Sequence, residues 1–132
     1  MNPANIHWLA VVSATLSTFL LGAVWYGPLF GRVWQRHMDL GDETLKRNVP
    51  RTFAIAAALT FVSAVNLAFF LGPAPSLAFG AAAGAATGVG FVATSLGVTY
   101  AFGRRPSRLA LIDAGYHAVS FTGMGVLLAA WR

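Results

Sequence analysis

Four long apolar segments, separated by short breaks, leave this sequence few possible folds. The segments cover residues 7–27, 52–71, 77–102 and 109–131. At about 1.5 Å per residue, each forms a helix long enough to cross a hydrocarbon core of roughly 30 Å. A membrane β-barrel would need shorter segments in which polar and apolar residues alternate, and none of the four alternates. We therefore predict an all-α integral membrane protein, a bundle of four transmembrane helices that forms one domain over residues 1–132.

The composition agrees with this prediction and narrows the possible functions. Apolar residues make up 57% of the chain and charged residues only 10%, too few charges to cover a soluble domain of this length. The chain has no cysteine, which excludes disulfides and thiolate metal sites. Its basic residues lie beside helix ends, so the net charge of +5 does not indicate nucleic acid binding. We expect the lipid bilayer as a partner, and no cofactor.

The basic residues predict how the helices are oriented. Eight of the nine flank the first and third breaks: Arg32, Arg36, Lys46, Arg47, Arg51, Arg104, Arg105 and Arg108. The opposite helix ends have only Arg132. Because cytoplasmic loops carry an excess of Lys and Arg, the first and third loops are predicted to be cytoplasmic and both termini to lie outside.

The longest connection, residues 28–49, begins with an amphipathic stretch. Apolar residues recur at helical spacing from Phe30 to Met38, opposite Arg32 and Arg36. This pattern is typical of a short helix in the headgroup region. The alternative is that the first helix continues beyond a kink at a proline. In either case we expect a group of interfacial residues here: Trp25, Pro28, Phe30 and Trp34.

The third segment carries a glycine face. Gly80, Gly84 and Gly88 recur every four residues, so they lie on one side of the helix and allow another backbone to approach closely. The pattern predicts tight helix packing of the glycine-zipper kind. It leaves open whether the partner helix belongs to the same subunit or to a second copy.

Asp113 is the only acid within the four segments. It lies about 6 Å below the predicted cytoplasmic boundary, where an unpaired carboxylate is costly and usually faces a partner or water. His117 follows one turn later on the same helical face. Counting along the other helices brings further polar side chains to this depth: Tyr26, Tyr100, Ser95 and, reaching down from the boundary, Arg51. We therefore expect a polar pocket in the cytoplasmic half of the bundle.

Two roles for Asp113 remain open. In the functional interpretation, Asp113 and His117 form a proton-handling pair, because a carboxylate tunes the proton affinity of a neighbouring imidazole. In the structural interpretation, Asp113 is a clamp that pairs with Arg51 or with an arginine of the third loop. No metal site is expected, because one histidine and one acid fall short of a ligand set.

Three stretches of the chain resemble a known family. They are Asn5-Ile6-His7-Trp8-Leu9-Ala10-Val11, then Trp25-Tyr26-Gly27-Pro28 with Phe30-Gly31 and Trp34, and Ile112-Asp113-Ala114-Gly115-Tyr116. Together they resemble the small bacterial membrane proteins catalogued as domain of unknown function 1761. The resemblance implies a four-helix fold in a bacterial cytoplasmic membrane and no established activity, substrate or cofactor. It adds Tyr116 to the motif positions around Asp113, whereas His117 is not one of them.

Three functions are compatible with these features. The leading hypothesis is a homo-oligomeric transport or permeation protein, because four short helices barely enclose a pathway. The second is a non-catalytic structural or accessory subunit of a membrane complex, joined through residues 77–102. The third is an enzyme acting on a lipid or quinone with Tyr26, Trp34 and Asp113, although the sequence shows no nucleophile, metal-ligand set or second acid for it.

Overall fold

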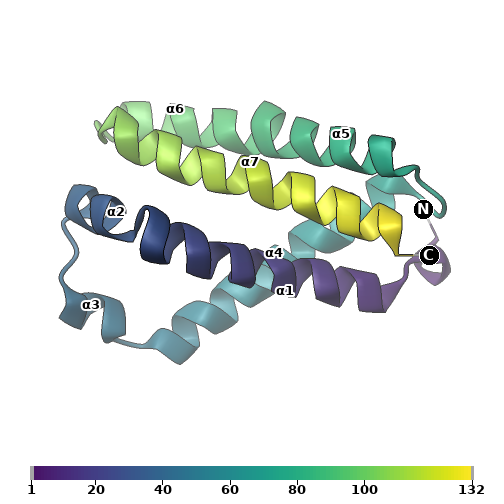
Figure 1. Cartoon of the computed structure of the whole chain (residues 1–132), viewed down its shortest axis with the longest axis horizontal. Coiled ribbons are helices and arrows are strands. Elements are labelled where there is room, and N and C mark those ends of the chain that lie inside the picture. The colour runs from purple at the N-terminus through teal and green to yellow at the C-terminus, as the bar shows by residue number, and fades with distance from the viewer. Residues whose placement is uncertain (1, 132) are drawn as a thin grey trace.

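The structure, a computed structural model, describes residues 2–131, and every regular element in this range is helical (Figure 1). A short 3-10 turn, η1 (Pro3–Asn5), precedes α1 (Trp8–Val24). Helix α1 continues into a π-helical turn, η2 (Trp25–Leu29), and the separate helix α2 (Gly31–Met38) follows. The remaining elements are α3 (Asp42–Lys46), α4 (Val49–Leu71), α5 (Leu77–Thr87), the π-helical turn η3 (Gly88–Ala93), α6 (Thr94–Phe102) and α7 (Ser107–Ala130).

Four stretches are long and apolar enough to cross a membrane, which confirms the predicted fold class. They are Trp8–Leu29, Val49–Leu71, Leu77–Phe102 and Ser107–Ala130, and their ends lie within three residues of the predicted ones. Their outer surfaces agree with a bilayer environment. Leu20, Phe91 and Leu111 are each 72–73% exposed, which suits contact with lipid and not with water.

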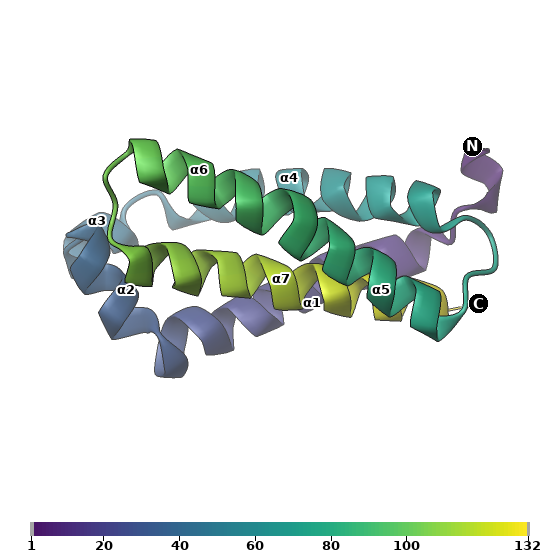
Figure 2. The ribbon, with the colours of Figure 1, turned by 90° about the horizontal axis from the view of Figure 1, so that it is seen from above.

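The two ends of the bundle differ in charge. Both termini and the connection between α4 and α5 lie at one end, which we call the terminal end (Figure 1). Helices α2 and α3 and the α6–α7 loop lie at the other, the basic end (Figures 1 and 2). The eight basic residues counted above belong to the basic end, and all eight are exposed.

Both interpretations of the long connection hold in part. The first helix does continue through Pro28, but as the π-helical turn η2. The helix then breaks at Phe30, whose backbone angles of φ −123° and ψ 2° leave the helical region, and the separate helix α2 follows. Arg32 and Arg36 are exposed on α2 while Trp34 is half-buried, so the predicted amphipathic segment is confirmed.

The glycine face packs within the chain, against α7. A Cβ atom at Gly84 would collide with the carbonyl oxygen of Phe121, and one at Gly80 would collide with that of Gly125. At Gly88 it would lie 2.9 Å from the Cα atom of Ala118. The contact expected from the sequence is therefore intramolecular. The same face cannot also serve as an interface with a second copy.

The terminal half of the bundle contains the apolar core. The core residues all lie in the terminal half of their helices: Ala10, Val11, Ala14, Ala64, Leu67, Leu71, Ala83, Phe121, Met124 and Leu128. In the other half, α4 crosses away from the remaining helices (Figures 1 and 2). Residues 50–55 at its start are all exposed, and the one aromatic contact among them is that of the Phe53 ring with Phe19 of α1, at a centroid distance of 5.7 Å. The bundle is therefore closely packed toward the terminal end and loosely packed toward the basic end.

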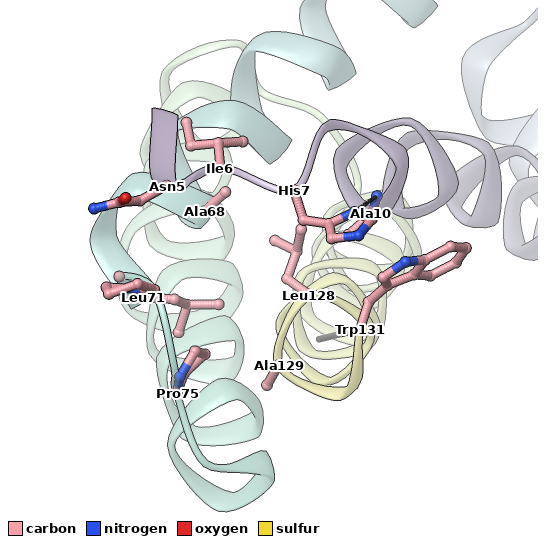
Figure 3. A pocket seen from close by; sticks show the side chains of 12 residues that line it. Asn5, Ile6, His7, Ala10, Ala68, Leu71, Pro75, Leu128, Ala129 and Trp131 are labelled. Atoms are coloured by element: carbon pink, nitrogen blue, oxygen red, sulfur yellow. Dashed lines mark hydrogen bonds between the residues drawn. The ribbon is translucent and has the colours of Figure 1, made fainter. Parts of the chain in front are cut away.

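A small pocket of about 40 Å³ lies at the terminal end between α1, α4 and α7 (Figure 3). His7 and Trp131 lie on one side of it, with ring centroids 5.8 Å apart, and Leu71 on the other. Since a water needs about 10–15 Å³ of such volume, the pocket has room for only a few waters. A shallower hollow of about 350 Å³ lies beside it, between η1 and the end of α4, and beneath both the apolar core closes the bundle.

Candidate functional site

Asp113 connects three membrane-crossing segments. It lies six residues into α7, about 9 Å along the helix from Ser107, and is only 7% exposed. The Tyr26 hydroxyl of η2 donates to its Oδ1 atom and the Tyr100 hydroxyl of α6 to its Oδ2 atom, each at 2.5 Å. We call these three residues the acid cluster. Because each carboxyl oxygen accepts a hydrogen bond from a different segment, the cluster holds η2, α6 and α7 together toward the basic end.

The tyrosines take the place of the arginine expected for the clamp. Within residues 2–131, no hydrogen bond joins Asp113 to an arginine, and Arg51 is exposed at the start of α4. The reason is that α4 diverges from α7 at this end. Ser95 also lies outside the cluster and is exposed. Ser95 precedes Tyr100 by five residues, so its side chain points about 140° away from that of Tyr100 around the helix. It therefore does not reach Asp113, although its depth is similar.

The π-helical turn η2 brings two adjacent aromatic residues to α7. Trp25 donates its indole N–H to the carbonyl oxygen of Ile112 at 2.9 Å, next to the Tyr26 bond with Asp113. Gly115 makes room for the indole, since a Cβ atom there would lie 3.0 Å from the ring. Such π-helical turns occur frequently at functional sites.

Aromatic rings surround the acid cluster. The Tyr26 ring meets Trp34 and Tyr116 edge-on, with centroids 5.5 and 5.2 Å away, and Trp25 meets Phe30 at 5.0 Å. Three of the four expected interfacial residues therefore line the basic end of the cluster, whereas Pro28 is exposed within η2. A largely apolar shell strengthens the hydrogen bonds inside it.

Tyr116 connects the acid cluster to a second polar region. Its hydroxyl donates to the carbonyl oxygen of Thr18 at 3.0 Å. Its ring contacts Tyr26 on one side and His117 on the other, the latter at a centroid distance of 5.1 Å. His117 shares the helical stripe of Asp113, as expected. In the described part of the chain it makes no hydrogen bond to that acid, and it lines a cleft instead.

This cleft, the mid-span cleft, has a volume of about 210 Å³ and lies between α1, α4, η3 and α7. Most of the surface that lines the cleft is apolar, although six of its lining residues carry a polar group and four are apolar: Thr18, Thr60, Ser63, Tyr116, His117 and Ser120, with Leu59, Val92, Phe121 and Met124. Thr18, Thr60 and His117 each lie within two residues of the middle of their membrane-crossing stretch. The cleft therefore lies near the middle of these membrane-crossing stretches.

The inner face of α7 changes character along its length. Asp113, His117 and Ser120 follow one another from the basic end to mid-span, and Met124 and Leu128 continue the same stripe to the terminal end. Only the half of the stripe toward the basic end is polar. This matches the loose packing of that half of the bundle.

Sequence reasoning missed the hydroxyl residues of the cleft: Thr18, Thr60, Ser63 and Ser120. Each looks ordinary in a membrane helix, where Ser and Thr bond to their own backbone, as Thr18 and Ser63 do here. The available signal was their common position, since one or two hydroxyls fall near the middle of three helices. Among residues 2–131, no three His, Cys, Asp or Glu side chains lie close enough together to hold a metal ion.

The fold and site define a four-helix membrane-spanning protein with a buried acid at one end and a polar cleft at mid-span. The chain belongs to the family described as "Protein of unknown function (DUF1761)", whose profile matches residues 9–129. The match confirms the family indicated by the motifs around Tyr26 and Asp113. No curated protein and no solved structure matches the chain.

Proposed function

We propose that this protein is a small transport or permeation protein of a bacterial cytoplasmic membrane and that its substrate passes through the mid-span cleft. The observation that carries the proposal is the asymmetry of the bundle, which is closed by an apolar core at the terminal end and has a polar cleft on the side of the basic end. Substrate sites of membrane transporters lie typically near the midplane, and alternating access opens such a site to one side at a time.

The polar lining supports a functional role over simple packing. Polar side chains inside a membrane are uncommon, and those that face a cavity usually mark a substrate or ion pathway. Here six polar side chains from α1, α4 and α7 converge on one cleft. A purely structural bundle would place apolar side chains at this level, as the terminal half does.

The contacts also support a proposal about which part would move. The acid cluster joins η2, α6 and α7, and the glycine face joins α5 to α7, so these segments form one unit. Helix α4 has neither connection, and its first residues are exposed. We therefore assign the opening and closing of the cleft to a movement of α4 against this unit. The acid cluster is then the clamp that keeps the unit rigid.

The orientation and assembly expected from the sequence are part of this proposal. The eight exposed basic residues support a cytoplasmic basic end, with both termini outside. A homo-oligomer would have to use a surface other than the glycine face, because that face is occupied by α7. The same occupation weakens the alternative of an accessory subunit joined through residues 77–102.

Transport can be tested without knowing the substrate, because the chain has no cysteine and a single introduced thiol reports on one position. Ser63→Cys places a thiol in the cleft. We expect a membrane-impermeant thiosulfonate to label it in inverted membrane vesicles, where the cytoplasmic face points outward, and also in intact cells. Labelling from both sides follows if the cleft opens alternately to each.

Two control variants establish which side of the membrane the reagent reaches in each preparation. Gly41→Cys, between α2 and α3, should react only in inverted vesicles, and Pro73→Cys, between α4 and α5, only in intact cells. The reverse pattern would overturn the proposed orientation. If Ser63→Cys reacts from one side only, or from neither, the transport proposal is wrong and an accessory role gains support.

A further inference from the structure

The mid-span cleft has an opening toward the bilayer. One wall is formed by Leu59, Thr60 and Ser63 of α4, and the other includes Val92 of η3. Helices α4 and α6 diverge from this level toward the basic end (Figure 1). Leu59 of the first wall and Phe91, the residue before Val92, are 65% and 72% exposed, which suits contact with lipid. A molecule dissolved in the bilayer therefore reaches the cleft sideways, between α4 and η3.

The lining carries no permanently charged side chain. Its titratable groups are Tyr116 and His117, while Asp113 and the basic residues lie outside it. A charge left without a partner at mid-membrane is costly. The cleft therefore suits an uncharged ligand.

Two accessible polar side chains of the cleft retain hydrogen-bonding capacity. The hydroxyls of Thr18, Ser63 and Tyr116 all donate to backbone carbonyl oxygens. By contrast, no hydrogen bond within residues 2–131 uses the side chains of Thr60, His117 or Ser120, and of these three Thr60 and His117 are half-buried whereas Ser120 is only 5% exposed. A neutral imidazole offers one donor and one acceptor, and a threonine hydroxyl offers both. The complementary ligand group is a neutral one that both donates and accepts, such as a hydroxyl.

The volume limits how much of a ligand the cleft holds. Pockets for drug-sized molecules measure about 300–1,000 Å³, and this cleft measures about 210 Å³. It accommodates a polar head and the first few carbons, which would pack against Phe121 and Met124. The rest of an apolar chain would extend between α4 and η3 into the bilayer.

We propose that the mid-span cleft binds the head of an uncharged, membrane-dissolved amphiphile, hydrogen-bonded to Thr60 and His117 with its tail in the bilayer. This rests on the proposed transport function, because it names the substrate class of the same cleft. It differs from that proposal in being a statement about binding, which is measurable without transport.

A series of decyl compounds with different heads tests the proposal. An environment-sensitive bimane attached to Leu59→Cys reports on the rim of the cleft in protein reconstituted into nanodiscs. Decanol should change its fluorescence saturably, whereas decane, decyltrimethylammonium and decanoate should give only the linear change of partitioning into lipid. A saturable response to decane would overturn the role of the head, and one to either ion would overturn the uncharged class.

Matched variants locate the binding. Thr60→Val keeps the shape of the side chain and removes its hydroxyl, and His117→Ala removes the imidazole. Each should weaken decanol binding, by up to about tenfold for one lost hydrogen bond. Ser95→Ala, an exposed hydroxyl outside the cleft, should leave binding unchanged. Unchanged binding in both cleft variants, or no saturation by decanol, contradicts the proposal, whereas Ser63→Cys labelling decides separately whether the protein transports anything.

Discussion

Substituting Gly84 with leucine should separate α5 from α7 and lower the melting temperature more than any change on the lipid-facing surface. Even one Cβ atom at this position would collide with the backbone carbonyl of Phe121. A backbone cannot move aside as a flexible side chain can, so the cost should reach or exceed the upper end of the about 1–3 kcal/mol typical of overpacking. Thermal unfolding in detergent, followed by circular dichroism, measures the effect.

Gly90→Leu is the matched control for this substitution. Gly90 lies on the same membrane-crossing segment, but nothing is within 4 Å of a Cβ atom built there. The leucine should therefore face lipid and leave the melting temperature unchanged or higher, because glycine is a poor helix former. Equal melting temperatures for the two variants would contradict the close packing of α5 on α7.

Removing the Asp113 carboxylate should cause the second large loss of stability. Asp113→Ala leaves the hydroxyls of Tyr26 and Tyr100 without their acceptor, and a half-buried hydroxyl of this kind costs about 1–3 kcal/mol when unpaired. Asp113→Asn should be milder, because the amide keeps one acceptor oxygen. The same unfolding assay compares the variants.

A rescue experiment separates this account from a nonspecific effect of the mutation. In the Asp113→Ala background, replacing Tyr26 and Tyr100 with phenylalanine removes the unpaired hydroxyls and should recover part of the lost stability. In the wild-type background, the same two replacements should destabilise, since they leave the carboxylate unpaired. If the changes in stability caused by the three substitutions simply add up, the three residues of the acid cluster are not energetically coupled.

The helices and their approximate ends were predictable from the sequence. The length of each apolar segment and helix-ending residues such as Gly72 and Pro106 are local signals. The glycine face was also predictable, but the helix that packs against it was not. Glycine spacing indicates that a backbone approaches closely, but only the structure shows that Gly80 and Gly84 meet α7 of the same chain. The choice between an intramolecular and an intermolecular contact depends on tertiary arrangement.

The acid cluster was only partly predictable for a geometric reason. Counting residues from a membrane boundary gives the depth of a side chain but not its direction around the helix. Tyr26 and Tyr100 satisfied both conditions, whereas Ser95 satisfied only the first. The prediction that Arg51 reaches Asp113 was wrong because α4 diverges at the basic end, which no local sequence pattern of that helix indicates.

The mid-span cleft was not predictable for the same reason. It exists because α4 diverges from α6, so that side chains which would otherwise be buried line a cavity. Thr18, Thr60 and Ser120 have no spacing that distinguishes them from helix-packing residues. The cleft became visible only when all four helices were placed together.

Thiol reactivity along the helices tests most directly whether the bundle is closed at one end and open to a polar cleft from the other. Single cysteines at Thr60 and His117 lie in the cleft, and those at Leu67 and Leu128 lie in the apolar core of the same two helices. In nanodiscs, the two cleft thiols should react readily with iodoacetamide, while the two core thiols should stay inert until the protein is denatured, because a thiol buried in apolar surroundings is unreactive. Similar reaction rates at all four positions would contradict the asymmetric bundle and, with it, the proposed transport cleft.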